Sequence, residues 1–161
     1  MPTNNSYKIR TKRQNLFLRV SKGHFATSHS HINYYIDVTI QKSRLSEAQA
    51  VAEELVSYYS HTTIVDTILC LDGTEVIGTC LAEALTRGSF TNLNAHQTIY
   101  VVTPERTAGS QLIFRDSLIP MIQGKNVLIL AASVTTGYTA KGAMEAPASD
   151  SWCWVFPPAR A

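Results

Sequence analysis

Residues 125–139 constrain the fold more than any other stretch, because their character changes abruptly in the middle. The first half holds four consecutive apolar residues, 127–130, which is typical of a strand covered on both faces in a parallel sheet. A turn follows in which Gly137 lets the backbone bend, and residues 140–146 are mostly helix formers. A strand, a turn and a helix N-terminus together present backbone N–H groups that suit a phosphate monoester. The turn also carries four hydroxyls, from Ser133, Thr135, Thr136 and Thr139.

On spacing alone, an ordinary strand-to-helix turn explains these residues, since Thr and Gly are common there for capping reasons. The string Val134-Thr135-Thr136-Gly137-Tyr138-Thr139 is more specific. It resembles the phosphoribosyl-pyrophosphate motif of the type I phosphoribosyltransferases, in which two acidic residues precede a Val/Ile-Thr-Thr-Gly-x-Thr loop. The resemblance implies that Ser133 and this string bind the 5′-phosphate. The acidic places are Ala131 and Ala132 here, so reduced or absent activity is expected.

A second match lies in residues 23–38. It resembles the N-terminal segment of orotate phosphoribosyltransferases, in which a Gly-x-Phe opening and a Ser-rich turn precede an aromatic strand that walls the base pocket. The resemblance assigns this wall to Tyr34 and Tyr35 and implies an N-terminal hood segment. The family's turn commonly carries a Lys for the orotate carboxylate, and none stands around Thr27 and Ser28, so the base is not identified.

His29 and His31 stand two apart in the same segment, and imidazoles at that spacing in a strand face the same way. This pattern allows a metal site. No Cys or acidic partner stands nearby in the sequence, so a structural or hydrogen-bonding role is the favoured interpretation.

Another strand–loop–helix unit spans residues 63–85, with the loop Asp72-Gly73-Thr74-Glu75 between its strand and its helix. The resemblance implies that this loop holds pyrophosphate. Two carboxylates would repel pyrophosphate unless a divalent cation lay between them. Mg²⁺ is therefore the expected cofactor, bound through the pyrophosphate and by Asp72 or Glu75. A helix cap made by Asp72 or Thr74 is an equally simple explanation of the loop.

The predicted strand at residues 97–102 runs into a Pro- and Gly-bearing loop, 103–110, which is expected to be mobile. In the resembled family a catalytic loop rich in Lys, with a His-Gly pair, emerges here. Arg106 is the one cation of this loop, so it is the candidate catalytic residue for stabilising the leaving pyrophosphate. Elsewhere, Ser46-x-x-Gln49 predicts a capping box at the start of a helix, and residues 111–123 predict part strand and part turn.

Composition excludes several other classes of protein. The 161 residues have room for one domain, and a net charge of +2 calls for neither nucleic acid nor an anionic membrane. No apolar run is long enough to span a bilayer, and the polar start lacks a signal core. Three cysteines without metal-ligand spacing suit a reducing cytosol, so a soluble cytoplasmic protein is expected.

The sequence divides into a basic N-terminal arm at 1–14, a phosphoribosyltransferase-like domain at 15–146 and an atypical tail at 147–161. Pro147 should end the last helix early, and the tail has no usable period. A truncated or frame-shifted end that leaves an exposed sheet edge is one interpretation. The alternative is an apolar lid or dimer contact made by three aromatic residues, Trp152, Trp154 and Phe156.

These resemblances imply an α/β protein with the type I phosphoribosyltransferase fold, a central mainly parallel sheet flanked by helices, and an N-terminal hood. The implied function is transfer of phosphoribose from phosphoribosyl pyrophosphate to a nitrogenous base, with Mg²⁺, in nucleotide synthesis or salvage. A non-catalytic sensor of phosphoribosyl compounds or nucleotides is the alternative. An unstable remnant of an open reading frame is a third interpretation. Relatives of this kind are often dimers, so a homodimer is compatible with the resemblance.

Overall fold

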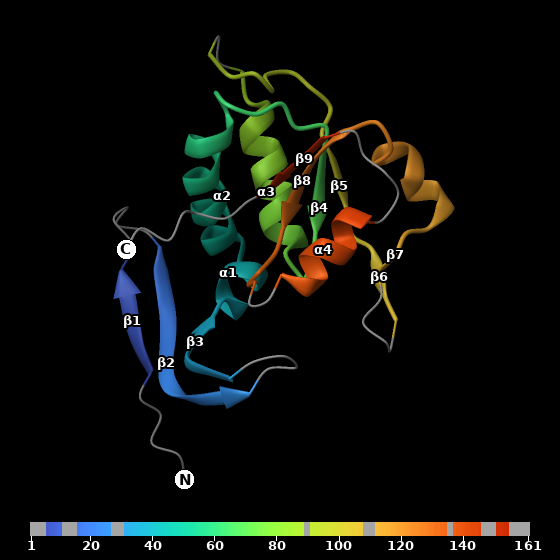
Figure 1. Ribbon diagram of the computed structural model, residues 1–161. Coiled ribbons are helices and arrows are strands. Elements are labelled where there is room, and N and C mark those ends of the chain that lie inside the picture. The colour runs from blue at the N-terminus through green and yellow to red at the C-terminus, as the bar shows by residue number, and fades with distance from the viewer. Residues whose placement is uncertain are drawn as a thin grey trace.

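The computed structural model describes residues 6–10, 16–26, 31–88, 91–107, 112–134, 137–145 and 151–154. Its centre is a four-stranded parallel sheet in the order β5-β4-β8-β9 (Figure 1). The strands are β4 (Thr67–Cys70), β5 (Tyr100–Val102), β8 (Asn126–Leu130) and β9 (Ser151–Trp154). The expected α/β class with a parallel central sheet is confirmed.

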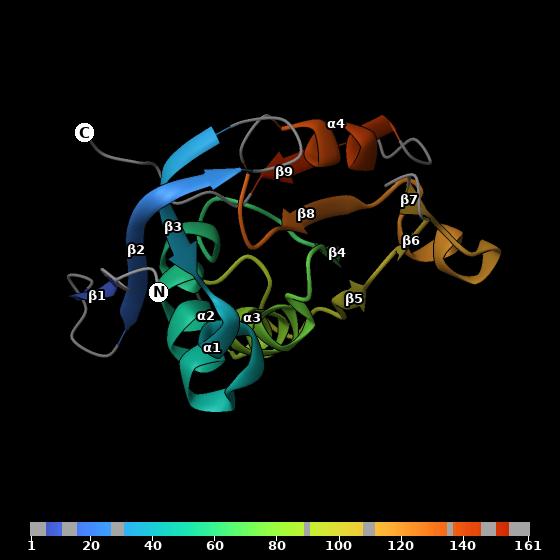
Figure 2. The ribbon, with the colours of Figure 1, turned by 90° about the horizontal axis from the view of Figure 1, so that it is seen from below.

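Helices cover both faces of this sheet (Figure 2). The helices α2 (Leu45–Tyr59) and α3 (Glu75–Thr86) pack on one face, and α4 (Tyr138–Glu145) packs on the other. Successive residues of a strand point to opposite faces, so β4 and β8 contribute alternately to two core clusters. The cluster under α2 and α3 takes Ile68, Cys70, Leu128 and Leu130, and the cluster under α4 takes Leu69, Val127 and Ile129. Residues 127–130 are all buried, which confirms a strand covered on both faces.

The N-terminal part forms a separate antiparallel sheet, β1-β2-β3, which Figure 1 shows beside and below the helices α1 and α2. Its strands are β1 (Ser6–Arg10), β2 (Phe17–Ala26) and β3 (His31–Asp37). Part of the expected basic N-terminal arm forms β1, which pairs with β2 along its whole length while all five of its residues stay exposed. The pairing places Tyr7 opposite Val20 and Ile9 opposite Leu18, and such cross-strand apolar pairs stabilise a sheet.

A short helix, α1 (Thr39–Ser43), connects this hood sheet to α2. Hydrogen bonds from the side chain and the backbone N–H of Thr39 hold the pKa of Asp37 below its usual range. The next helix, α2, begins at Leu45, and the residue before it makes no side-chain cap. Ser46 therefore lies inside the helix, and the predicted capping box at Ser46 is wrong.

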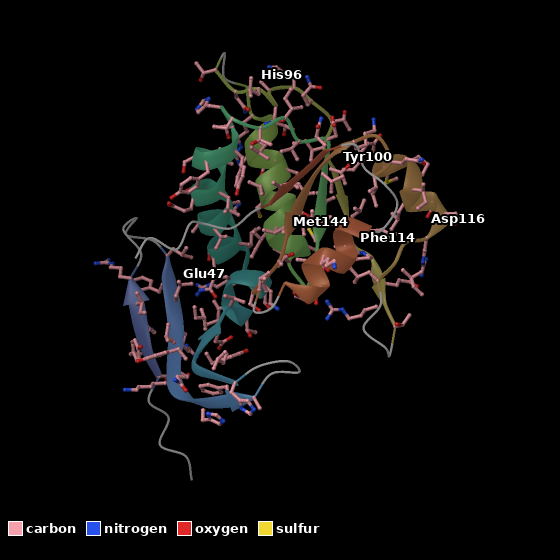
Figure 3. All side chains as sticks on the ribbon, viewed as in Figure 1. Glu47, His96, Tyr100, Phe114, Asp116 and Met144 are labelled. Atoms are coloured by element: carbon pink, nitrogen blue, oxygen red, sulfur yellow. The ribbon has the colours of Figure 1, made fainter. Side chains whose placement is uncertain are left out.

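The described residues between β5 and β8 form more regular secondary structure than the sequence predicts. Residues of the expected mobile loop form β6 (Glu105–Arg106), which pairs with β7 (Leu112–Ile113) as a two-stranded ribbon. A 3₁₀ helix, η1 (Asp116–Met121), follows and contains Pro120, where the sequence predicted strand and turn. Phe114 and Met144 pack against the cluster on the α4 side of the sheet, and Figure 3 shows them in that region.

The last described segment of the chain pairs with the central sheet. Residues 151–154 form β9, so the edge of β8 is paired rather than exposed, and the expected free edge at β8 is not found. The remaining tail residues, 147–150 and 155–161, lie outside the described part of the chain.

None of the described helices combines the length and the apolar character that crossing a membrane requires.

Gly78 sets how closely α3 approaches the sheet. A Cβ atom at this position would overlap Sγ of Cys70 and would lie 3.4 Å from Val101 Cγ1 and 3.5 Å from Ile68 Cγ2. Gly78 therefore has a packing role, even though glycine is a poor helix former. The Cys70 thiol is completely buried in this contact, and burial raises its pKa to about 12.

Candidate functional site

Three loops leave the carboxyl ends of neighbouring parallel strands. Residues 71–74 follow β4, residues 103–104 follow β5, and residues 131–137 follow β8. Because β5, β4 and β8 are parallel neighbours, these loops emerge at one edge of the sheet, where ligands of open α/β sheets bind. Figure 1 shows this edge next to α1, the β6–β7 ribbon and the start of α4.

The loop after β8 turns the chain from the sheet into α4. Gly137 has a φ of 77°, and no heavy atom lies within 4 Å of the place where its Cβ would stand. Among the described residues, the space at this Cβ position is therefore open, and the glycine is required by the backbone conformation rather than by crowding. The backbone N–H of Lys141 donates to the carbonyl of Gly137 at 2.8 Å, which starts the helix.

Several predicted phosphate-binding residues can be placed on this turn. Ser133 and Val134 are exposed after β8, and Thr139 is exposed in the first turn of α4. Thr135, Thr136 and the side chain of Tyr138 lie outside the described part of the structure. Ala131 and Ala132, which stand where the resembled motif has acidic residues, are partly buried at the end of β8.

The loop after β4 has an unusual backbone. Asp72 and Gly73 both have left-handed conformations, with φ of 58° and 79°. Asp tolerates this region better than most residues, and Gly adopts it without strain. The loop therefore turns sharply before α3, which begins at Glu75.

The side chain of Thr74 faces the protein interior. It is buried, and its hydroxyl lies 2.9 Å from the carbonyl of Leu71 and 3.0 Å from the carbonyl of Leu130. The single hydroxyl proton is shared between these two acceptors, so Thr74 connects its own loop to the end of β8. It makes no side-chain cap on α3, and only its backbone remains to contact a phosphate.

Two cationic side chains reach the loop after β4. Arg106 Nη2 lies 2.9 Å from Asp72 Oδ1, and Lys42 Nζ donates to the backbone carbonyl of Asp72 at 2.7 Å. The arginine comes from β6 and the lysine from α1, so the ribbon and the hood connection meet at Asp72. Lys42 escaped the sequence analysis because no local pattern marks it: thirty positions separate it from Asp72.

Comparison with known proteins identifies the fold. No family model matches the sequence, and no curated protein matches it significantly. Among solved structures, UMP synthase of Leishmania donovani is similar with a TM-score of 0.56 and 20% sequence identity, over 84% of this chain and 27% of that chain. The chain has the type I phosphoribosyltransferase fold. It spans about a quarter of the length of the UMP synthase chain, as the 27% coverage shows.

A second solved structure is the orotate phosphoribosyltransferase of Mycobacterium tuberculosis H37Rv in complex with Fe(III) dicitrate. It has a TM-score of 0.49 and 14% identity, over 82% of this chain and 73% of that chain. At 20% identity, the likeness to the UMP synthase concerns the fold alone.

The phosphoribosyltransferase fold brings two carboxylates to the expected pyrophosphate loop. Asp72 is engaged by Arg106, and Glu75 Oε1 accepts a long hydrogen bond of 3.4 Å from the hydroxyl of Thr103. Within the described ranges, no three metal-ligating side chains gather into a potential metal centre. Mg²⁺ in proteins is commonly held by one or two carboxylates together with substrate phosphates and water. Asp72 and Glu75 fit that mode of binding.

The hood tyrosines of this phosphoribosyltransferase fold differ from each other. Tyr34 and Tyr35 are consecutive in β3, so their side chains point to opposite faces of the hood sheet. Both are about half exposed, at 51% and 47%, and the ring of Tyr35 lies 5.6 Å from the ring of Phe25. The two tyrosines therefore face opposite sides of the hood sheet, and their assignment to the base pocket stays a prediction.

Proposed function

We propose that the protein binds phosphoribosyl pyrophosphate at the carboxyl edge of the sheet and transfers phosphoribose to a nitrogenous base. The proposal is carried by one observation: the open turn at Gly137 and the cation-flanked loop at Asp72 emerge from neighbouring strands of a phosphoribosyltransferase fold. Such a transferase would serve nucleotide synthesis or salvage, and the site itself does not select the base.

The 5′-phosphate is assigned to residues 133–139. Backbone N–H groups at the start of α4 and the hydroxyls of Ser133 and Thr139 lie at an exposed turn, which suits a dianion. None of the described residues beyond its chain neighbours fills the space at the Cβ position of Gly137. Thr135 and Thr136 complete this assignment in the sequence.

The pyrophosphate is assigned to residues 72–75 together with Lys42 and Arg106. Bound Mg²⁺, held by Asp72 or Glu75 and by the diphosphate, would neutralise charge on the leaving group. Lys42 and Arg106 add two positive charges beside the loop, and charge-assisted hydrogen bonds from such groups stabilise a departing anion. Because the Arg106 and Asp72 side chains are 43% and 32% exposed, their ion pair contributes at most about 1 kcal/mol and opens readily for a ligand.

A specific observation favours a second candidate, a non-catalytic sensor of phosphoribosyl compounds. Ala131 and Ala132 occupy the end of β8, where they offer no side-chain hydrogen bond to a ribose hydroxyl. Binding of a phosphate at the turn after β8 does not require a hydrogen bond to a ribose hydroxyl from these two positions. Binding can therefore persist in a protein whose turnover is slow or absent.

Calorimetric titration with phosphoribosyl pyrophosphate, with and without Mg²⁺, tests the proposal. Binding that requires Mg²⁺ is expected, and Thr136→Val should weaken it roughly tenfold or more, because a hydrogen bond to a charged phosphate is lost. Thr98→Val is the matched control, since Thr98 is exposed before β5 at the opposite edge of the sheet. Turnover of a base by the bound protein separates the transferase from the sensor. A folded protein that binds neither phosphoribosyl pyrophosphate nor ribose 5-phosphate would refute both candidates.

Lys42→Ala should weaken pyrophosphate binding by about tenfold or more, because Lys42 Nζ lies at the backbone of the proposed pyrophosphate loop. Binding of ribose 5-phosphate should stay unchanged, since that ligand lacks the diphosphate. Lys125→Ala removes the same charge just before β8, at the other edge of the sheet, and serves as the control. Equal losses in the two variants would indicate a general charge effect and would remove Lys42 from the site.

A further inference from the structure

We propose that His24 and His31 form a two-imidazole binding site for a divalent transition-metal ion at the tip of the hood hairpin. His24 Nε2 and His31 Nδ1 lie 3.0 Å apart, and the two rings stack with centroids 4.8 Å apart and an interplanar angle of 18°. Both side chains are exposed, so solvent and ions reach the nitrogens. The site lies in the hood sheet and does not depend on the proposed transferase function.

The backbone explains why these two residues meet. Ala26 lies directly opposite His31 in the pairing of β2 with β3, and His24 stands two positions before Ala26. The register of this pairing shifts between Lys22 and Phe25, so His24 lies at an irregularity of β2. Such irregularities redirect side chains, and here the two imidazoles come together across the hairpin.

The spacing of the nitrogens suits a shared ion. In the metal-free pair one ring nitrogen donates its proton and the other accepts it. A metal ion that replaces this proton uses one lone pair from each ring. With metal–nitrogen bonds of roughly 2.0–2.1 Å, two neighbouring ligands stand about 2.8–3.0 Å apart around an octahedral ion and about 3.3–3.4 Å apart around a tetrahedral one. The observed 3.0 Å matches the octahedral spacing and is a few tenths of an ångström short of the tetrahedral one.

The donor set also selects the kind of metal. Imidazole nitrogen suits Zn²⁺, Cu²⁺ and Ni²⁺, with Cu²⁺ bound most tightly, whereas Mg²⁺ requires oxygen ligands. Among the described residues, no third His, Cys, Asp or Glu joins His24 and His31. Water would therefore complete the coordination of the ion. The site is therefore distinct in chemistry from the Mg²⁺ assigned to the pyrophosphate loop.

Metal binding should stabilise the hood. His24 lies in β2 and His31 begins β3, so an ion held by both joins the two strands on either side of their connection. Because the ion binds the folded hairpin better than the unfolded chain, it should raise the melting temperature, and the rise should grow with the logarithm of the free-ion concentration above the dissociation constant. Acid should abolish the effect, since a protonated imidazole cannot bind metal.

The test uses untagged protein, titrated with Zn²⁺, Cu²⁺ and Mg²⁺ and followed by calorimetry and thermal melting. Zn²⁺ and Cu²⁺ are expected to bind and to stabilise, and Mg²⁺ is not expected to do so at His24 and His31. His24→Asn or His31→Asn should weaken Zn²⁺ binding by at least about tenfold, because the loss of even an outer partner of a metal ligand costs roughly 10–100-fold. The electron paramagnetic resonance spectrum of the Cu²⁺ complex should show superhyperfine coupling to two imidazole nitrogens.

His96→Asn is the matched control. His96 is exposed and lies at the opposite end of the molecule from the hood (Figure 3), and Asn accepts its left-handed backbone. This variant should bind Zn²⁺ like the original protein. Unchanged Zn²⁺ affinity in a folded His24→Asn/His31→Asn double variant, or coupling to a single nitrogen, would overturn the proposal.

Discussion

Replacing Ala131 and Ala132 together by aspartate is expected to raise phosphoribosyl transfer by a factor of hundreds or more. The two residues follow β8 at the carboxyl edge of the sheet, where carboxylates would accept hydrogen bonds from ribose hydroxyls. Two charge-assisted hydrogen bonds contribute about 3–6 kcal/mol to transition-state binding. The measurement is pyrophosphate release from phosphoribosyl pyrophosphate and Mg²⁺ with a panel of nitrogenous bases.

Ala131→Asn with Ala132→Asn is the matched control, because asparagine has the size of aspartate without its charge. This variant should remain far slower than the aspartate variant. Ala131 packs against the core cluster under α4, so thermal melting must first show that each variant is folded. A folded aspartate variant that binds phosphoribosyl pyrophosphate but gains no activity with any base would favour the sensor.

Gly78→Ala is expected to destabilise the protein by about 2 kcal/mol, even though alanine is the better helix former. The new methyl group would overlap Sγ of Cys70, and overpacking of this kind costs about 1–3 kcal/mol. We place Gly78 at the upper end because Cys70 lies in a strand and has no exposed surface. The gain of about 1 kcal/mol in helix propensity offsets part of this cost. The melting temperature should fall by about 4–8 °C.

Gly142→Ala makes the same chemical change in α4 and should have the opposite sign. Gly142 is exposed, and no heavy atom lies within 4 Å of its missing Cβ. Only the helix propensity changes there, so a stabilisation of about 0.5–1 kcal/mol is expected. If Gly78→Ala were as stable as Gly142→Ala, the close approach of α3 to β4 would be contradicted.

The sequence predicted the parts of the fold that depend on local patterns. The apolar run at residues 127–130 specified β8 because both faces of that strand are buried, and a helix was expected where α3 forms. The 3₁₀ helix η1 and the strand β1 were missed, because the proline of η1 and the charges of β1 mask their apolar positions. Their structure depends on pairing and packing with distant residues.

The candidate functional site could likewise be predicted only where a local sequence pattern marks its residues. The turn around Gly137 could be read from its own string of residues. Lys42 could not, because it reaches Asp72 only after α1, α2 and β4 have brought it there. The buried state of Thr74 was equally hidden, since its second acceptor belongs to Leu130, which lies 56 positions away in the sequence. Residue types indicated which chemistry was present, and the tertiary fold decided which groups stand together.

The two hydrogen bonds of the Thr74 hydroxyl affect how the site would bind a ligand that carries a phosphate at one end and a pyrophosphate at the other. By bonding the carbonyls of both Leu71 and Leu130, it fixes the starting points of the two loops relative to each other before any ligand arrives. The distance between the places assigned to the 5′-phosphate and the pyrophosphate is then a built-in property of the sheet edge. Binding of a ligand that matches this distance costs less conformational entropy, because these loops have already been ordered during folding. By fixing the spacing of the two loops, the buried Thr74 would determine which length of substrate can bind at both ends.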